Sequence, residues 1–394
     1  MNLKNTSDNP SPSGRLGGAL YLHIPFCKQA CHYCDFHFST TLNRKDEMIE
    51  ALVKELQLRK GEFQNTTVTT IYFGGGTPSV LSIDEIQLLI NTVYRYYKVI
   101  DGPEITLEAN PDDLTTTTTT KISELANSPI NRLSIGIQSF FDEDLQQMNR
   151  AHNSKEAKEC LSEATQHFDN ITVDLIYGIP NMTSERWKQN LQKVFDFGVN
   201  HISSYALTVE PKTALAAFIR QGKYPNASEE LALEHFNILV DETEKQGFVH
   251  YEISNFGKPD YFSKHNTSYW FGKPYLGIGP SAHSFNVKER SWNVSNNIKY
   301  IQAIQKGKLP QEIEELSKND HFNELVMTGL RTIWGVSLDK VAQDFGIEYK
   351  NQLLKNSQEF IKHKLMYLDE NERLITTKKG KFLVDGLASD LFVI

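Results

Sequence analysis

Six short apolar runs alternate with longer segments of helical periodicity over the first half of the chain. The runs lie at 20–24, 68–73, 105–109, 132–137, 171–176 and 202–207. Between them, apolar residues recur at intervals of three and four positions over 44–60, 83–97, 154–168 and 184–198. Such intervals give a helix one apolar face that can pack on a sheet. Strands that alternate with helices predict an α/β fold with a parallel sheet. We therefore expect a closed or partial TIM-type barrel of about six β-α units, with a doubly wound open sheet as the alternative.

The pattern changes after about residue 210. A stretch rich in aromatic residues and glycine runs to residue 285, and we expect edge strands and loops there. From about residue 320, three helical segments are followed by two strand-like runs around a polar turn, an order that resembles a winged helix. The predicted domains are a flexible polar tail over 1–18, a barrel with a C-terminal extension over 19–305, and a smaller, mainly helical, winged-helix-like domain over 312–394. The six threonines at 115–120 are read as a helix start that follows the loop NPDDL.

Composition narrows the class of protein. A chain of 394 residues can form one large and one smaller domain. A net charge of −8 argues against a surface that neutralises phosphates, so we expect no nucleic acid and interpret the C-terminal segment as a packing or partner module. No apolar run is long enough to span a bilayer, and the tail has no secretory signal. Four cysteines do not make a disulfide scaffold. We expect a cytoplasmic protein, which leaves transient membrane association and the oligomeric state open.

Three of the four cysteines follow the first predicted strand within eight positions, as Cys27, Cys31 and Cys34. Three thiolates in a short loop can close around one inorganic centre, because thiolate sulfur is the ligand that zinc and iron–sulfur clusters select. A four-iron cluster held by three cysteines keeps one iron open, whereas a structural zinc site needs a fourth ligand. The histidines that would supply it are His23, His32 and His37. Both centres stay candidates beside three buried structural cysteines, and Cys160 is expected to be a plain buried residue.

The cysteine spacing resembles the signature of the radical S-adenosylmethionine (SAM) superfamily. The flanks YLHIPFC and YCDF resemble the oxygen-independent coproporphyrinogen III oxidases and the related HemW haem chaperones. The resemblance implies a 4Fe–4S cluster with three irons on the three cysteines, and SAM bound through its amine and carboxylate to the fourth. Reduction of such a cluster cleaves the SAM sulfonium, a reaction that the cofactor supplies while the protein orients it.

Further polar and glycine positions fit the same resemblance. GGGTPS at 74–79 lies between a strand and a helix, where glycines let backbone N–H groups approach a ligand, although a tight structural turn has the same pattern. Polar residues also stand in the third, fourth and fifth predicted strands, where apolar ones would be the default. The resemblance implies that these two regions, Arg150 and two tyrosines bind SAM. The full set is Tyr21, Tyr33, Gly75, Gly76, Thr77, Glu108, Gln138, Arg150 and Asp174.

Two features separate this chain from the oxidases it resembles. Those enzymes carry a further cysteine two positions after the third, where this sequence has Phe36, and a longer segment before the first strand. The haem chaperones have an aromatic residue at that position and share the motif HNxxYW, here His265, Asn266, Tyr269 and Trp270. Histidine is a common axial ligand of haem iron, and aromatic rings can stack on a porphyrin. If His265 is not the ligand, the next candidates are His250 and His283.

The resemblance therefore implies a haem chaperone that binds a 4Fe–4S cluster, SAM and haem and transfers haem to an apo-haemoprotein acceptor. The alternative is an oxygen-independent coproporphyrinogen III oxidase, which decarboxylates its substrate oxidatively. A zinc-stabilised binding module is the third interpretation.

Overall fold

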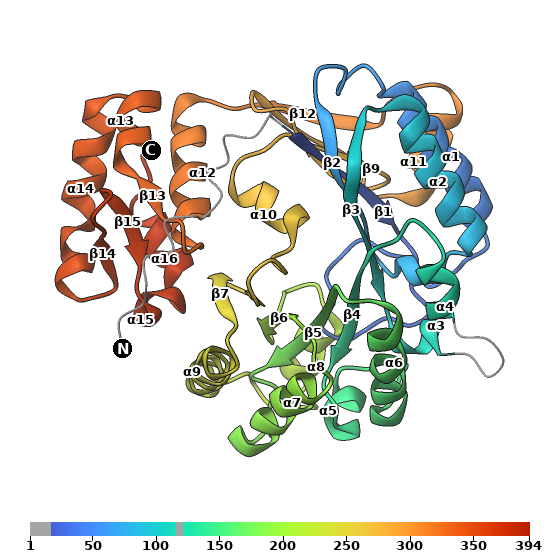
Figure 1. Ribbon diagram of the computed structural model, residues 1–394, viewed down its shortest axis with the longest axis horizontal. Coiled ribbons are helices and arrows are strands. Elements are labelled where there is room, and N and C mark those ends of the chain that lie inside the picture. Colours follow the sequence, from blue (N-terminus) through green and yellow to red (C-terminus); the bar gives the residue numbers. More distant parts are fainter. Residues whose placement is uncertain (1–16, 116–120) are drawn as a thin grey trace.

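The computed structural model describes residues 17–115 and 121–394 (Figure 1). All six predicted strands form, and they pair in parallel in the order in which they follow along the chain. They are β1 (Gly17–Ile24), β2 (Thr67–Gly75), β3 (Val99–Ala109), β4 (Arg132–Gln138), β5 (Ile171–Tyr177) and β6 (His201–Ala206). A doubly wound sheet would reverse its strand order partway, and this sheet does not. The prediction of a partial TIM-type barrel is confirmed.

The four predicted helices are confirmed to within two residues at each end. They are α1 (Lys45–Leu58), α2 (Ile83–Tyr96), α6 (Ser154–His167) and α7 (Ser184–Asp196). Ser82 and Asn153 form capping boxes at the starts of α2 and α6, which satisfy N–H groups that a helix leaves unpaired. Shorter helices are η1 (Pro78–Val80), α3 (Pro111–Leu114), α4 (Lys121–Ala126) and α5 (Asp142–Gln147). The segment NPDDL, predicted as a loop, forms α3, while the helix start predicted over the threonine run lies at 116–120, outside the described residues.

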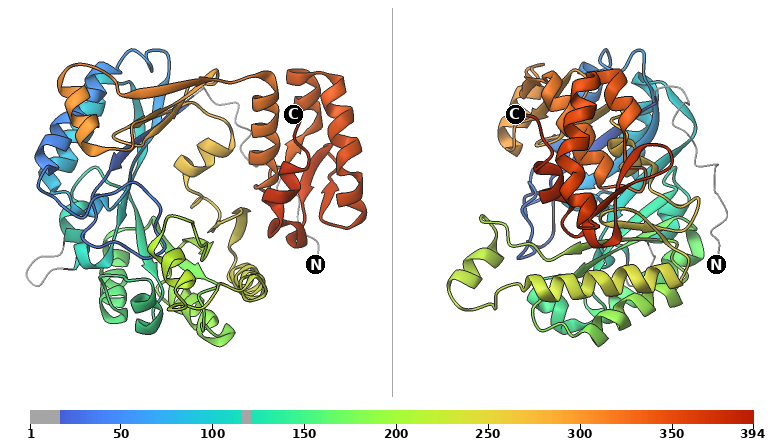
Figure 2. Two further views of the ribbon diagram at one scale, coloured as in Figure 1. Left: turned by 180° about the vertical axis from the view of Figure 1, so that it is seen from behind. Right: turned by 90° about the vertical axis from the view of Figure 1, so that its left-hand side faces the viewer.

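Further strands extend the sheet at both ends to twelve strands within the described residues. Beyond β1 lie β9 (Tyr275–Ile278), β10 (His283–Phe285), β11 (Glu289–Asn293) and β12 (Gln311–Glu315), and beyond β6 lie β8 (Asn255–Gly257) and β7 (Val249–Glu252). The ends of the sheet, β12 and β7, do not pair with each other, so the barrel is open. Helices cover the outer face of the sheet (Figures 1 and 2).

The expectation of edge strands and loops between about residues 210 and 285 is right for β7, β8, β9 and β10 and wrong for three helices in the same stretch. Those helices are α8 (Ala214–Arg220), α9 (Glu229–Lys245) and α10 (Lys264–Trp270), and a further helix, α11 (Asn297–Gln305), follows beyond it. Serine side chains cap α9 and α10. The HNxxYW motif therefore lies on a helix, α10, which is placed between the sheet and the C-terminal domain (Figure 1).

The C-terminal segment has a core of its own, built around Phe322, Val341 and Leu374 and separate from the barrel core. Its helices are α12 (Lys318–Leu330), α13 (Leu338–Phe345) and α14 (Ile347–Lys362), and a small sheet contains β13 (Val336–Ser337), β14 (Met366–Leu368) and β15 (Arg373–Thr376). The predicted helices and two strands are present. Two terminal helices, α15 (Lys378–Lys381) and α16 (Val384–Ser389), were not predicted. The domain bounds 19–305 and 312–394 stay predictions.

Hydrogen bonds, ion pairs and aromatic contacts tie this segment to the barrel. The Ile333 N–H donates to the Tyr251 carbonyl oxygen at 3.0 Å, and Lys381 Nζ donates to the His250 carbonyl oxygen at 2.8 Å. Arg290 of β11 forms an ion pair with Glu324 of α12. The two cores therefore stand beside each other with space between them. Within the described residues, no helix has the length and apolar character that crossing a membrane requires.

Candidate functional site

The loop after β1 brings the three clustered cysteines to the carboxyl end of the sheet, where chemistry in barrels is found. The Cys27 N–H donates to the Ser39 carbonyl oxygen at 3.0 Å, and the Ser39 N–H donates to the Pro25 carbonyl oxygen at 2.9 Å, which closes the loop at its base. Midway, the His32 N–H donates to the Met148 carbonyl oxygen at 3.1 Å. Backbone hydrogen bonds therefore set the shape of this loop.

The three thiols line one cavity of about 400 Å³. The Thr77 hydroxyl donates to Cys27 Sγ, and Arg150 Nη1 donates to Cys31 Sγ, both at 3.3 Å. Burial raises the pKa of Cys27 to about 12 and that of Cys34 to about 11, so these thiols are protonated at neutral pH unless a metal displaces the protons. Three soft donors on one cavity wall fit an iron–sulfur cluster.

A closed zinc site needs a fourth ligand beside the three thiols. The three histidines are held in other bonds. His23 Nε2 donates to the His37 carbonyl oxygen at 2.9 Å, His32 Nδ1 donates to the Gln147 carbonyl oxygen at 3.0 Å, and His37 Nε2 is 2.7 Å from Asn297 Oδ1. The geometry therefore supports the cluster over zinc.

The GGGTPS segment forms another wall of this cavity through Gly75, Gly76 and Thr77. A side chain at Gly76 would place its Cβ 2.6 Å from the Phe26 carbonyl oxygen, and Gly75 has a φ of +111° that other residues rarely adopt. Only glycine fits both positions. The segment ends in the 3₁₀ turn η1, and the predicted helix, α2, begins after it at Ile83. The glycines therefore offer close backbone approach at a distance from the start of the long helix.

Two half-buried carboxylates face the thiols from the barrel interior. Glu108 accepts hydrogen bonds from the Tyr72 hydroxyl at 2.8 Å and the Gly75 N–H at 3.3 Å, and Asp174 accepts one from the Ser134 hydroxyl at 3.2 Å. Burial raises the pKa of each to about 7. Neither forms an ion pair with any residue in the described ranges. Such carboxylates favour a ligand that is cationic or rich in hydroxyl groups, as SAM is.

Arg150 joins three parts of the site. Besides Cys31, its guanidinium donates to Asn110 Oδ1 at 2.6 Å and to the Gly136 carbonyl oxygen at 2.8 Å. The ends of β3 and β4 are thereby fixed to the cysteine loop. Gln138, at the end of β4, has a φ of +64°, an unusual value for a residue other than glycine, and lines the same cavity. The sequence did not single out Asn110, although it follows β3 directly.

The structure brings together most of the predicted SAM contacts and sets Tyr21 apart. The predicted residues that line the thiol cavity are Tyr33, Gly75, Gly76, Thr77, Glu108, Gln138, Arg150 and Asp174. Tyr21 lines a second, larger cavity, where its ring stacks on Tyr72 at 6.1 Å. The assignment of all these residues to SAM stays a prediction.

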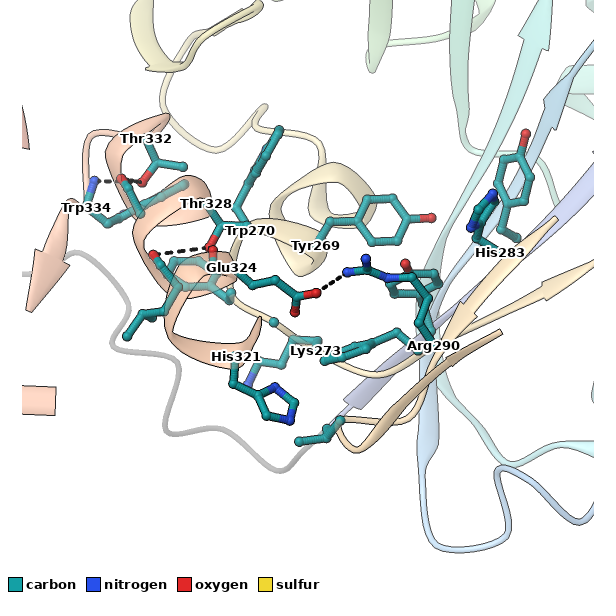
Figure 3. A pocket seen from close by; sticks show the side chains of 18 of the residues that line it. Tyr269, Trp270, Lys273, His283, Arg290, His321, Glu324, Thr328, Thr332 and Trp334 are labelled. Carbon is teal, nitrogen blue, oxygen red and sulfur yellow. Dashed lines mark hydrogen bonds and ion pairs between the residues drawn. The ribbon is translucent and has the colours of Figure 1, made fainter. Parts of the chain in front are cut away.

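The second cavity, of about 1410 Å³, lies between the barrel extension and the C-terminal domain (Figure 3). Tyr269 and Trp270 of the HNxxYW motif line it, whereas Asn266 does not. Asp35 and Phe36 line both cavities, and Phe36 is 68% exposed. The cavities therefore share a wall that comes from the cysteine loop.

His265 lies outside both cavities and is 1% exposed. Its Nδ1 is hydrogen bonded to the Thr70 hydroxyl and its Nε2 to the Tyr269 hydroxyl, both at 2.8 Å. Burial lowers its pKa to about 3. Both ring nitrogens are engaged, so the predicted role of His265 as a haem ligand, which stays a prediction, would require one of these bonds to break.

Comparisons with known proteins agree with this site. The family model for the radical SAM superfamily matches residues 21–194, and that for the HemN C-terminal domain matches residues 316–383. The structure resembles coproporphyrinogen III oxidase (HemN) from Escherichia coli with a TM-score of 0.81, over 96% of this chain and 90% of that one. At 23% identity this likeness shows the fold alone. Fold and matched models define a radical SAM protein, a class that implies a 4Fe–4S cluster and SAM.

Two curated relatives define the family more closely. The chain is 34% identical to a protein named heme chaperone HemW from Lactococcus lactis, over 93% of this chain and 97% of that one. It is also 34% identical to the heme chaperone HemW of Bacillus subtilis, over 83% of this chain and 86% of that one. The chain belongs to the HemW family, and the resemblance drawn from the cysteine loop is confirmed.

Replacement of one loop cysteine tests the ligand set. We expect Cys31→Ala to abolish assembly of the iron–sulfur cluster during anaerobic reconstitution, because two thiolates cannot replace three. The far-ultraviolet circular dichroism of the protein will stay close to that of the parent, since the barrel has a large core of its own. Iron analysis and visible absorbance provide the measurement.

The matched control is Cys160→Ala, which removes the buried thiol on α6. It should assemble a full cluster. A full cluster spectrum in Cys31→Ala, or one zinc and no iron in the reconstituted parent, would contradict the assignment.

The two half-buried carboxylates predict a pH dependence of stability. Both pKa values lie above the ordinary value of about 4, so the folded chain holds protons that the unfolded chain releases between about pH 4 and pH 7. Stability from these groups is therefore lost as the pH rises through this window. Glu108→Gln and Asp174→Asn should each raise the thermal midpoint of the ligand-free protein at pH 8 by about 2 °C or more, and less at pH 5.

The same substitutions should weaken SAM binding to the cluster-loaded protein, measured by calorimetry, because they remove negative charge beside a cationic ligand. Glu159→Gln on the exposed face of α6 is the control. Equal shifts of the midpoint at the two pH values would contradict the raised pKa values of Glu108 and Asp174.

Proposed function

We propose that this protein is a haem chaperone that holds a 4Fe–4S cluster and SAM in the cavity lined by the three cysteines, binds haem beside them, and transfers haem to an apo-haemoprotein acceptor. The family supports this proposal through the names of its curated relatives. Free cysteines at the site require a reducing compartment, so the proposal includes the cytoplasm as its location.

The observation that carries the proposal is the shared wall between the two cavities. Asp35 and Phe36 follow Cys34 directly and line both spaces. A ligand in the larger cavity would touch the loop that holds the cluster. Haem has a large apolar face, and the exposed ring of Phe36 offers an apolar contact to it.

The residues of the smaller cavity suit SAM in complementary ways. Glu108 and Asp174 supply negative charge, and Gly75 and Gly76 permit close approach of the backbone. Arg150 orients the loop through Cys31 and Asn110. When bound, the cluster and SAM would supply one-electron chemistry, and the protein would position them and exclude water.

Phe36 also separates this function from the oxidase alternative. The similarity in fold to the Escherichia coli oxidase does not carry its activity to this chain. An oxidase must hold a tetracarboxylate and place two propionate groups in turn against the reacting centre, which demands accurate distances. A carrier needs an accessible iron ligand and apolar walls.

One experiment tests chaperone against oxidase. We expect the anaerobically reconstituted protein to bind ferric haem with roughly one-to-one stoichiometry, from titration followed by visible absorbance. It should form no protoporphyrinogen IX from coproporphyrinogen III when supplied with SAM and a reductant. Product porphyrin is measured by chromatography after oxidation.

The control is an authentic coproporphyrinogen oxidase assayed in parallel, which shows that the assay detects turnover. Turnover by this protein would overturn the chaperone proposal. Absence of haem binding would overturn it as well, because a chaperone must hold its cargo.

A further inference from the structure

We infer that haem binds in the larger cavity, between α12 and the barrel extension, with His321 or His283 as the ligand to its iron. This inference rests on the proposed haem function. It places haem outside the thiol cavity and gives the haem iron a ligand other than His265 of the HNxxYW motif.

The hydrogen bonding of the histidines is the first argument. Four histidines line this cavity, His23, His37, His283 and His321. His23 uses both ring nitrogens, in bonds to the Tyr21 hydroxyl and the His37 carbonyl oxygen, and His37 uses one. The rings of His283 and His321 form no hydrogen bond with any residue of 17–115 or 121–394. These two rings can bind iron through either nitrogen without the loss of an internal bond, whereas His37 has only its Nδ1 left to offer.

The positions of the two rings are the second argument. His321 lies in the first turns of α12, on a face that continues through Leu325 and Thr328 along the cavity. His283 lies on β10, and its ring stacks on Trp292 at 5.9 Å. Figure 3 shows the two histidines on opposite walls, with Arg290 and Glu324 paired between them. Either wall can therefore present a ligand to a group held in the space.

The walls and volume suit a large flat ligand. The cavity of about 1410 Å³ exceeds the roughly 300–1,000 Å³ of common small-molecule sites. Aromatic rings of Trp270, Phe271 and Trp334 lie together along one side, with the Phe271 and Trp334 ring centres 4.7 Å apart. A porphyrin face gains from such apolar contact.

The charges suit the two propionate groups of haem. Among the described residues, five cationic side chains line the cavity against three carboxylates, Asp35, Glu324 and Asp344. Arg290 and Lys340 are paired with Glu324 and Asp344. The other cations, Lys273, Lys318 and Arg373, form no ion pair with a described residue. Lys273 lies beside His321 (Figure 3), so a ligand bound through His321 would have a cation within reach of its carboxylates.

The test is a titration of ferric haem into the full-length, cluster-loaded protein and its variants, followed by the Soret band and by resonance Raman spectra of the iron–ligand state. We expect the double variant His283→Ala with His321→Ala to lose at least tenfold in affinity and to lose the histidine-ligated spectrum. One of the two single variants should reproduce most of this loss. Both positions border open space, so these variants will fold.

Two controls make the result specific. His363→Ala removes an exposed histidine at the end of α14 and should bind haem like the parent. His265→Gln, checked for folding by circular dichroism, should keep the histidine-ligated spectrum, because His265 faces Thr70 and Tyr269.

Native affinity and spectrum in the double variant would overturn the inference while the proposed function stands. The same holds if His265→Gln alone abolishes the ligated spectrum in a folded protein. Failure of the parent itself to bind haem would overturn the proposed function, and this inference with it.

Discussion

The loop between β1 and α1 is held at its base by two backbone hydrogen bonds, between Cys27 and Ser39 and between Ser39 and Pro25. These bonds turn the chain back on itself, so that the cysteines face the barrel interior while Asp35 and Phe36 reach the cleft beside the C-terminal domain. Both cavities depend on this turn. Without these bonds, the positions of the thiols and of Phe36 would not be fixed relative to each other, and the two cavities would not share a wall.

Two carboxylates in the barrel interior lower the stability of the fold, and the rest of the structure must offset this loss. Glu108 and Asp174 are half-buried and form no ion pair with a described residue, and removal of an ionised group from water is expensive. Their raised pKa values mean that partial protonation relieves this cost near neutral pH. The large apolar core of six parallel strands and their helices supplies the stability that lets such groups remain in the site. A small metal-dependent domain would lack this reserve.

The spacing of residues along the chain predicts those elements of the structure that depend on neighbouring residues alone. The six strands and four long helices follow from the spacing of apolar residues, and the cysteine loop follows from three thiols in eight positions. Glu108, Gln138 and Asp174 stood out because a polar residue in a buried strand needs a reason. In the structure all three line the thiol cavity.

Features that depend on contacts between distant segments could not be predicted from the sequence pattern. The sequence analysis does not predict α9, because aromatic residues and glycines around this segment favour strands and loops, although Ser228 caps a regular amphipathic helix. The burial of His265 depends on Thr70, almost two hundred positions earlier, and no motif contains that information. The large cavity combines side chains from 35–37, 269–290 and 318–345, so its existence follows only from how the two cores stand together.

The two cavities differ in what supports them, and this difference bears on their roles. The thiol cavity lies within one core, where Arg150 ties the ends of β3 and β4 to the cysteine loop. The larger cavity has walls from two cores, which meet in contacts such as those of Ile333 with Tyr251 and Lys381 with His250. Packed cores resist deformation, whereas separate cores can shift as bodies. The site within one core therefore suits a resident cofactor, and the site between two cores suits a cargo that must enter and leave.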